Sequence, residues 1–380
     1  MLKPVYLDHN ATTPIDPEVR AAMEPFLEHE FGNPSSTHWF GIAPKRGVAT
    51  ARKQVAEILN CSAEEIIFTS GGTKSNNHAI IGTAHALKKK GNHIITTQIE
   101  HPAVLNVCSY LEAFGFRITR AGVDEHGLVN VSDIKDAITS ETILITVMHA
   151  NNEIGTIEPI EEIACIAKEK QILFHTDAAQ SAGKIPTDIQ LLGVDILSIA
   201  GHKLYAPKGV GALFIRKGID SGVFMHGAGQ EMGKRAGTEN VPGIVGLGKA
   251  CEIAKRDMAA NQERMKRTRD TLLEELKKGR PDLSPNGHPE KVLPNTLSIS
   301  FKGLEANRIL EEIGLKVAAS AGAACHSDVV EISHVLVALG LPESSAKGTV
   351  RLSTGKNTSD ADIDAAAQAT LKALKTLMRG

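Results

Sequence analysis

The sequence predicts an α/β fold with a largely parallel central sheet, joined to a smaller α+β domain. Between about residues 50 and 250, short apolar runs typical of buried strands alternate with helical stretches. A long charged helical stretch follows without strand signals. The 380 residues, 42% of them apolar, suffice for two domains. We expect residues 16–258 to form the large domain, and residues 1–15 with 259–380 to form the small one.

Each element of this prediction comes from a local pattern. Strands are expected at residues 66–69, 93–97, 117–121, 142–148, 172–176, 196–200 and 212–215. Helices are expected at residues 75–90, 101–114, 132–138 and 160–170, and a long one at 245–279. The small domain should contain a strand at 296–301, a helix at 305–312, a small-residue loop and a terminal helix from about Asp360. Ligands of such sheets bind beyond the carboxyl ends of the strands, so the residues there are the candidate site residues.

Composition excludes several classes of protein. The formal net charge of −2 gives no sign of a nucleic-acid or anionic-membrane partner. Apolar runs stay shorter than the roughly 18 residues of a membrane span, and no signal-peptide pattern is present, so a cytoplasmic protein is expected. The five cysteines show no CxxC spacing, which argues against a disulfide framework or a metal site. They are Cys61, Cys108, Cys165, Cys251 and Cys325.

Lys203 and Asp177 carry the strongest chemical signal. Each follows an apolar run, and the two runs are expected to be neighbouring strands. A lone lysine in such a place is usually a solvated loop residue, and a lone aspartate is often a helix cap. Together they suit pyridoxal phosphate (PLP): the lysine forms a Schiff base, and the aspartate keeps the pyridine nitrogen protonated.

A second signal is the turn Thr69-Ser70-Gly71-Gly72-Thr73, between a strand and a helix. Glycines let backbone N–H groups approach an anion, and a helix N-terminus favours negative charge. The pattern is not GxxxxGK[ST], so a nucleotide loop is not indicated. An ordinary capped turn is the alternative, but one phosphate fits the motif.

Polar residues follow the other predicted strands. His101 could stack on a cofactor ring and carry protons, or merely cap a helix. Asn152 lies in a polar turn and could bind oxygens of a cofactor or substrate. The residues that fall where a strand gives way to a loop or helix are Thr73, His101, Asn152, Asp177, Gln180 and Lys203. In a parallel sheet these positions converge on one face.

With these residues in view, the chain resembles the NifS/IscS-type cysteine desulfurases, in the class V branch of fold-type I PLP enzymes. The resemblance runs from Tyr6 to Lys356. The motifs that carry it are TSGGTKSNN, EHPAV, NNEIGTI, HTDAAQSAGKIP, GHKLYAPKGVGAL and RAGTENVP.

The resemblance implies a role for each candidate. Lys203 would form the Schiff base and move protons, Asp177 would pair with the pyridine nitrogen, and Gln180 would bond the ring oxygen O3′. His101 would stack on the ring. The phosphate would be held by Gly72, Thr73 and His202, and Thr238 would reach the phosphate of a partner subunit, which makes a homodimer the expected assembly. Asn152 and Arg351 would bind the substrate carboxylate. The family often has serine where this chain has Ala200, so one phosphate hydrogen bond is expected to be absent.

Cys325 lies in the predicted small-residue loop, and the alternative to a nucleophile is a buried structural cysteine. By resemblance it would take sulfur from L-cysteine, form a persulfide and release alanine; it could also contact an iron–sulfur cluster transiently. We expect His326 and Asp328 to tune the pKa of its thiol.

The segment 323–328 resembles selenocysteine lyases, whereas 331–336 returns to the desulfurase pattern. The first hypothesis is therefore a cysteine desulfurase that passes sulfur to an acceptor or scaffold protein, and the second is a selenocysteine lyase acting on L-selenocysteine. A PLP aminotransferase or lyase without persulfide chemistry, and a non-catalytic scaffold, are further alternatives. The sulfur acceptor stays open, with iron–sulfur assembly, tRNA thiolation, DNA phosphorothioation and selenium recycling all compatible.

Overall fold

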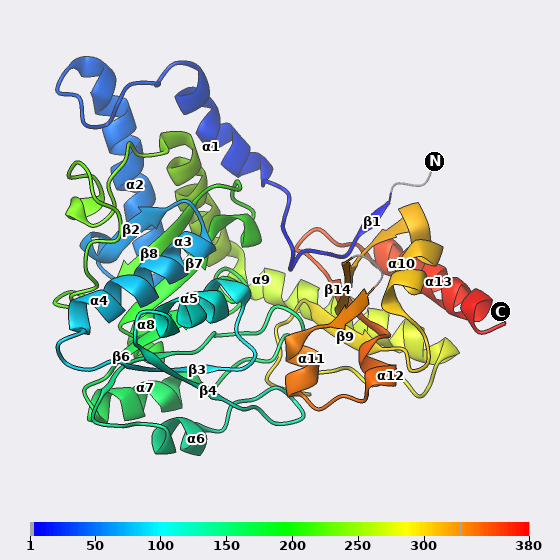
Figure 1. The fold of residues 1–380 in the computed structure, drawn as a ribbon. Coiled ribbons are helices and arrows are strands. Elements are labelled where there is room, and N and C mark those ends of the chain that lie inside the picture. The colour runs from blue at the N-terminus through cyan, green and yellow to red at the C-terminus, as the bar shows by residue number, and fades with distance from the viewer. Residues whose placement is uncertain (1–3, 327–328, 380) are drawn as a thin grey trace.

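The computed structural model describes residues 4–326 and 329–379, and only the backbone of residues 323–326 and 329–331. Two bodies lie side by side, and the long helix α9 (Val241–Gly279) runs from one to the other (Figure 1). This helix begins four residues earlier than the sequence pattern predicts. The Oδ1 of Asn240 accepts a hydrogen bond from Gly243 N at 3.2 Å and so caps it there.

The larger body is built on a seven-stranded sheet in the order β2-β8-β7-β6-β5-β3-β4. The strands are β2 (Ile66–Thr69), β3 (His93–Thr97), β4 (Arg117–Ala121), β5 (Thr142–Thr146), β6 (Leu173–Asp177), β7 (Ile196–Ala200) and β8 (Gly211–Ile215). Strands β7, β6, β5, β3 and β4 run parallel, and β8 runs antiparallel to both its neighbours. The prediction of a mostly parallel central sheet is confirmed.

Helices cover both faces of this sheet, which is why its strands read as continuous apolar runs. Successive residues of β2 serve opposite faces, since Phe68 belongs to one hydrophobic cluster and Ile67 to the other. The helices of this body are α1 (Pro17–Glu28), α2 (Ile42–Leu59), α3 (Gly72–Asn77), α4 (Thr83–Leu87), α5 (Pro102–Glu112), α6 (Val131–Asp136), α7 (Ile160–Glu169) and α8 (Ile189–Leu192). A π-helical turn, η3 (His78–Gly82), joins α3 to α4, so one helical segment spans 72–87 rather than 75–90.

The smaller body has its own core around a three-stranded antiparallel sheet. Its strands are β11 (Ser320–Ala321), β14 (Thr349–Ser353) and β9 (Thr296–Ser300), covered by α10 (Ala306–Ile313), α13 (Asp360–Leu377) and the end of α9. The N-terminal strand β1 (Val5–Tyr6) pairs in parallel with β10 (Val317–Ala318), and Val5 and Leu7 belong to this second core. The exact division at residues 16 and 258 stays a prediction.

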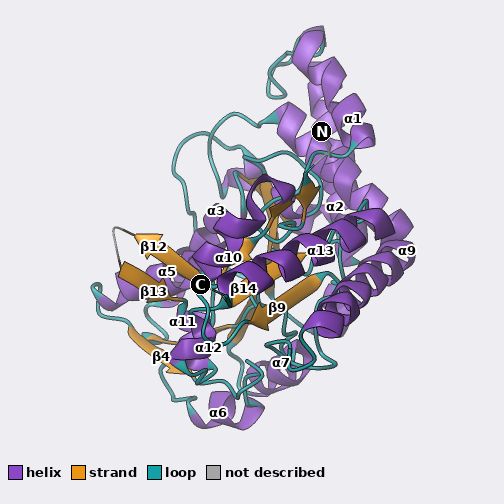
Figure 2. Ribbon diagram, turned by 90° about the vertical axis from the view of Figure 1, so that its right-hand side faces the viewer, coloured by secondary structure: helices purple, strands orange, loops and turns teal. Residues whose placement is uncertain are grey.

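The segment around Cys325 differs from the loop that its small residues predict. It forms a hairpin of β12 (Ala323–His326) and β13 (Val329–Ile332), with Cys325 paired to Val330. The β-branched residue types of the second strand favour this conformation. Figure 2 shows the hairpin projecting from the smaller body. Asp328 lies outside the described residues, and the side chains of Cys325 and His326 are not described, so the tuning hypothesis stays a prediction.

Two short helices follow the hairpin, α11 (His334–Ala338) and α12 (Glu343–Ala346). Val335 and Leu336 of α11 are buried in one cluster with Ile99 and Met148 of the larger body. The hairpin is therefore connected to a helix that packs beside the ends of β3 and β5.

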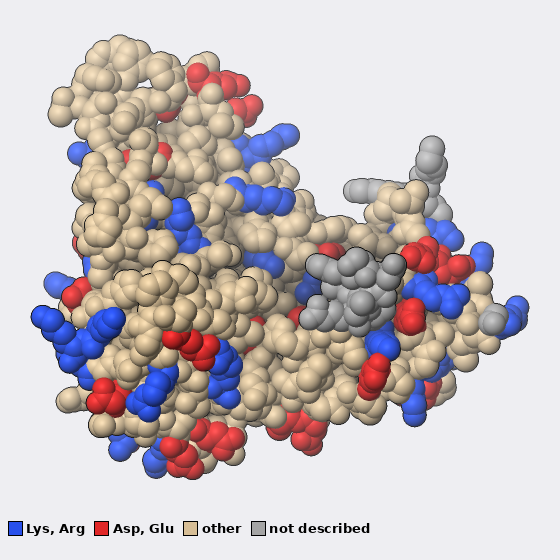
Figure 3. All heavy atoms as spheres, viewed as in Figure 1, with Lys and Arg blue, Asp and Glu red and all other residues tan. Residues whose placement is uncertain are grey.

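The surface carries no dominant charge on the face drawn in Figure 3, where basic and acidic side chains are mixed. This agrees with the net charge of −2. Within 4–326 and 329–379, none of the helices combines the length and apolar character needed to cross a bilayer.

Candidate active site

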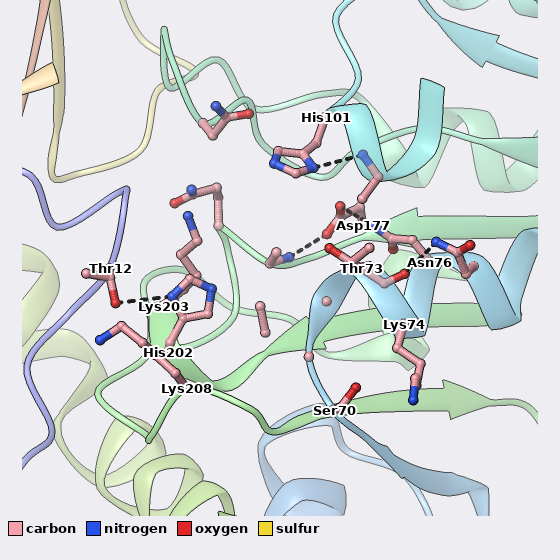
Figure 4. A pocket seen from close by; sticks show the side chains of 18 of the residues that line it. Thr12, Ser70, Thr73, Lys74, Asn76, His101, Asp177, His202, Lys203 and Lys208 are labelled. Atoms are coloured by element: carbon pink, nitrogen blue, oxygen red, sulfur yellow. Dashed lines mark hydrogen bonds between the residues drawn. The ribbon is translucent and has the colours of Figure 1, made fainter. Parts of the chain in front are cut away.

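A cavity of about 820 Å³ opens beyond the carboxyl ends of β2, β3, β5, β6 and β7 (Figure 4). Because parallel strands end at one edge, residues far apart in the sequence meet here. The cavity lining includes eight of the predicted residues, namely Gly72, Thr73, His101, Asn152, Asp177, Gln180, His202 and Lys203.

Lys203 ends the short helical turn that follows β7. Its Nζ donates a hydrogen bond to the backbone carbonyl of Asn10. Burial, and next the nearby Arg351 guanidinium, lower the pKa of Lys203 to about 8. A larger fraction of this lysine is therefore a neutral nucleophile near pH 7 than of an exposed lysine.

Asp177 is the last residue of β6 and is buried beneath the cavity. Its Oδ2 accepts a hydrogen bond from Asn76 Nδ2 at 2.6 Å, and its Oδ1 accepts one from the Ala179 N–H at 2.9 Å. Both bonds hold the carboxylate in one orientation toward the cavity that it lines. A carboxylate oxygen that is fixed in this way can accept a hydrogen bond from a protonated ring nitrogen.

The start of α3 forms an anion cradle at another wall. Gly71 has φ +140°, which favours glycine, and a Cβ added to Gly72 would lie 3.0 Å from the Ala200 Cβ. The two glycines thus bring the chain close to β7 and leave the helix start open to the cavity. Lys74 and Lys208 also line this cavity and add positive charge.

The two histidines of the cavity have distinct partners. His101 caps α5, since its Nδ1 accepts a hydrogen bond from Ala103 N at 3.0 Å, and it lines the cavity as well. Because Nδ1 accepts this hydrogen bond, the neutral form of the His101 ring carries its proton on Nε2. Desolvation by the surrounding protein lowers the pKa of His101. His202 Nδ1 lies 3.2 Å from Thr12 Oγ1, and burial followed by Lys203 lowers the pKa of His202 to about 4.

Two predicted site residues, Arg351 and Thr238, are not in the described lining of this cavity. Arg351 contacts Asn152 and Asp8. Its guanidinium donates hydrogen bonds to the Asn152 carbonyl at 2.9 Å and to Asp8 Oδ1 at 2.8 Å. Thr238 is exposed on the loop before α9. Only the backbone of Cys325 is described, so its distance from the other groups is not part of this geometry.

Sequence reasoning missed Asn10, which is fully buried. Its carbonyl accepts hydrogen bonds from Lys203 and from Gln180 Nε2, and its side chain reaches Lys184 and Thr296. Asn10 lies within the stretch from Tyr6 to Lys356 that the family resemblance covers, but its role depends on long-range contacts. Asn76, also missed, lies one helical turn after Gly72, and this spacing was a usable signal.

Comparison with known proteins agrees with this geometry. A model of the aminotransferase class-V family matches residues 5–366. The cysteine desulfurase IscS of Dictyoglomus turgidum is 50% identical over 96% of this chain and 93% of its own length. The chain belongs to the cysteine desulfurase branch of the class-V aminotransferases. This family membership confirms the resemblance drawn from the motifs, the fold class and PLP as the cofactor.

Solved structures of this family superpose closely. A NifS-like protein has a TM-score of 0.93 at 37% identity, covering 98% of this chain and all of the other, 100%. A structure of SspA in complex with cysteine has a TM-score of 0.83 at 36% identity, covering 93% of this chain and 100% of that one.

The residues present fit PLP on the structure's own evidence. An amine with a lowered pKa, a buried fixed carboxylate and a helix start that needs glycine share a single cavity. These features match the aldehyde, the pyridine nitrogen and the phosphate of the cofactor respectively.

Proposed function

We propose that this family member removes sulfur from L-cysteine, releases L-alanine and holds the sulfur as a persulfide on Cys325 for transfer to an acceptor. The observation that carries the proposal is the convergence of Lys203, Asp177 and the α3 start in one cavity. The 50% identity to a protein named cysteine desulfurase supports the choice of reaction.

Each cavity residue has a distinct task in this proposal. Bound PLP supplies an electron sink that eases bond breaking at the substrate carbons. Lys203 holds the cofactor and moves protons, and Asp177 keeps the pyridine nitrogen protonated. His101 stacks on the ring and assists proton transfer, while Gln180 donates to the ring oxygen. The phosphate contacts are Gly72, Thr73 and His202.

Asn152 and Arg351 are proposed to bind the substrate α-carboxylate. The position of Arg351 directly behind Asn152 supports this pairing. The second terminal nitrogen of Arg351, Nη2, binds Asp8 Oδ1 at 2.8 Å. Bidentate binding of a substrate carboxylate therefore requires Arg351 to leave Asp8. Substrate carboxylate thus replaces the Asp8 carboxylate on the same guanidinium.

The sulfur transfer step uses the Cys325 thiolate as nucleophile. A sulfur–sulfur bond forms between Cys325 and the γ-sulfur of the substrate as the substrate Cβ–S bond breaks. The electron pair of the broken bond stays on carbon, which takes up a proton and leaves as the methyl group of alanine. The hairpin must bring Cys325 to the cavity and then to an acceptor protein.

A homodimer with shared active sites is part of the proposal. The loop before α9 is held on the edge strand β2, where Glu231 accepts from Phe68 N at 2.7 Å and Arg235 Nε donates to Phe68 O at 3.0 Å. Thr238 follows Arg235 by three residues and is exposed. Thr238 would then meet the phosphate of the partner subunit. The cytoplasm stays the expected location.

Parallel kinetics of alanine release from L-cysteine and L-selenocysteine test this function. We expect turnover of L-cysteine, with loss of that turnover in Cys325→Ala. A preference for L-selenocysteine of several orders of magnitude would favour the lyase, which the residues 323–328 resemble. Sulfide release from L-cysteine by Cys325→Ala at the wild-type rate would instead exclude the persulfide route.

A further inference from the structure

Lys184 is a buried lysine that contacts the cavity residue Gln180 and has no task in the proposed function. It is 5% exposed and lies on the turn after β6. Its Nζ donates hydrogen bonds to Gln180 Oε1 at 2.8 Å and to Asn10 Oδ1 at 3.1 Å. Both acceptors are neutral amide oxygens, and no described carboxylate pairs with this lysine.

A buried amine in such surroundings is costly when charged. Burial, followed by the nearby positive charges of Lys203 and Arg351, lowers the pKa of Lys184 well below its usual range. Gln180 Oε1 and Asn10 Oδ1 each accept a hydrogen bond from an N–H group of Lys184. Lys184 therefore has two hydrogen-bond acceptors but no countercharge among the described residues, and Gln180 Oε1 is one of these two acceptors.

This contact decides which way the Gln180 amide faces. With Oε1 held by Lys184, the amide nitrogen lies at the Asn10 carbonyl, to which it donates at 2.9 Å. The reversed amide would place its oxygen against the Asn10 carbonyl oxygen, and Lys184 would lose Gln180 Oε1 as its acceptor. One N–H of Gln180 remains, and the residue lines the cavity.

We propose that Lys184 is a positioning residue, which orients the Gln180 amide so that it donates a hydrogen bond to the ring oxygen of PLP. This inference rests on the proposed function, in which Gln180 faces that oxygen. Lys184 acts through Gln180 and does not line the cavity itself, as far as the described residues go.

The test reads the pH midpoint of the absorption band of PLP bound to the purified protein. A donor to the ring oxygen favours its anionic form, so losing that donor raises the midpoint, by roughly one pH unit. Apart from Lys184 itself, which lies close enough to Lys203 for their charges to interact, the charged and titratable groups around Lys203 stay unchanged in the variants. These groups are Asp8, His101, Asp177, His202 and Arg351.

Lys184→Met keeps the length of the side chain and removes the donor. We expect its midpoint to rise as much as that of Gln180→Leu. The double variant should show no further rise, because both substitutions remove the same hydrogen bond to the ring oxygen. Lys170→Met, the same substitution at an exposed lysine, should keep the wild-type midpoint.

Three results contradict the proposal at different levels. A wild-type midpoint in Lys184→Met beside a raised one in Gln180→Leu overturns the role of Lys184 alone. An unchanged midpoint in Gln180→Leu removes the ring contact on which that role depends. A wild-type protein that binds no PLP contradicts the proposed function itself.

If Lys184→Met does not fold, Lys184→Gln replaces it in the test. Glutamine presents a donor or an acceptor and so leaves both orientations of the Gln180 amide open. An intermediate midpoint is expected for this variant, and a wild-type midpoint overturns the proposal.

Discussion

The side of this protein that lines the cavity, called the cofactor side, and the side that carries Cys325, called the sulfur side after its proposed role, are built in opposite ways. On the cofactor side, Lys203 and Asp177 stand at the ends of buried strands, and partners such as Asn10 and Asn76 hold them in place. On the sulfur side, Cys325 lies in a two-stranded hairpin, and β12 pairs with β13 alone among the described strands. The difference fits the proposed function, in which proton transfer at a fixed ring needs preorganised groups and sulfur delivery needs a segment that can reach an acceptor.

One small contact region ties the two sides together. His334 Nε2, at the start of α11, lies 2.9 Å from the Glu100 carbonyl, immediately before His101. The buried Val335 and Leu336 pack in the same region. The base of the hairpin is therefore anchored next to the cavity while the hairpin itself projects (Figure 2).

The largest expected effect comes from removing the anchor of the cofactor side. Lys203→Ala should lower kcat/KM for L-cysteine by at least about 1000-fold, because both the covalent link and the proton carrier are lost. Loss of the PLP absorption band, with an unchanged circular dichroism spectrum, checks that the fold is intact. Activity within tenfold of wild type would contradict the role of Lys203.

Removing the nucleophile should separate the two sides. Cys325→Ala is expected to lower alanine release by roughly 1000-fold and yet to keep PLP affinity and its absorption band at the wild-type values. Stopped-flow spectra with L-cysteine measure both quantities at once. A simultaneous loss of PLP affinity would mean that the sides are not independent.

An intermediate effect is expected at the pyridine nitrogen. Asp177→Asn keeps the shape of the side chain but removes its negative charge, and should lower kcat by about 100-fold. Steady-state kinetics at PLP saturation measure this loss. Asp188→Asn, at the partly buried N-cap of α8 and outside the cavity lining, provides a matched control that should keep wild-type kinetics. A fully active Asp177→Asn would exclude the charge pairing.

The anchor between the two sides should give a smaller effect. His334→Ala removes one hydrogen bond worth about 1 kcal/mol, so persulfide formation should slow by roughly fivefold while the PLP band stays unchanged. Single-turnover persulfide labelling measures the rate. His85→Ala, at an exposed histidine of α4, should behave as wild type. Equal rates in both variants would show that the anchor does not control the hairpin.

The smallest effect on activity is expected at Glu100, beside that anchor. Burial raises the pKa of Glu100 to about 8, and its Oε1 accepts from Thr97 Oγ1 at 2.8 Å. Because the folded state holds this proton above the usual carboxyl pKa, the protein should lose stability as pH rises from about 4.5 to about 8. Glu100→Gln removes this titration, so its Tm relative to wild type should rise across that window, with activity near wild type. A constant Tm difference across the window would show that Glu100 does not carry this proton.

Local patterns predicted the cofactor side well, because a polar residue directly after an apolar run marks the end of a strand. Lys203, Asp177 and Gly72 could be found in this way without knowledge of the fold. The contact between Asn10 and Lys184 could not, since it joins positions that are 174 residues apart in the sequence. The hairpin was missed because the small residues around Cys325 suggest a loop, although the β-branched residues of its second strand favour a strand.

Mass spectrometry of the Cys325 peptide, after incubation of the purified enzyme with L-cysteine, tests the central claim most directly. The account predicts one added sulfur atom on Cys325, alanine in solution, and neither product with Lys203→Ala. Alanine release without sulfur on Cys325, or with sulfur only on the exposed Cys165, would contradict it.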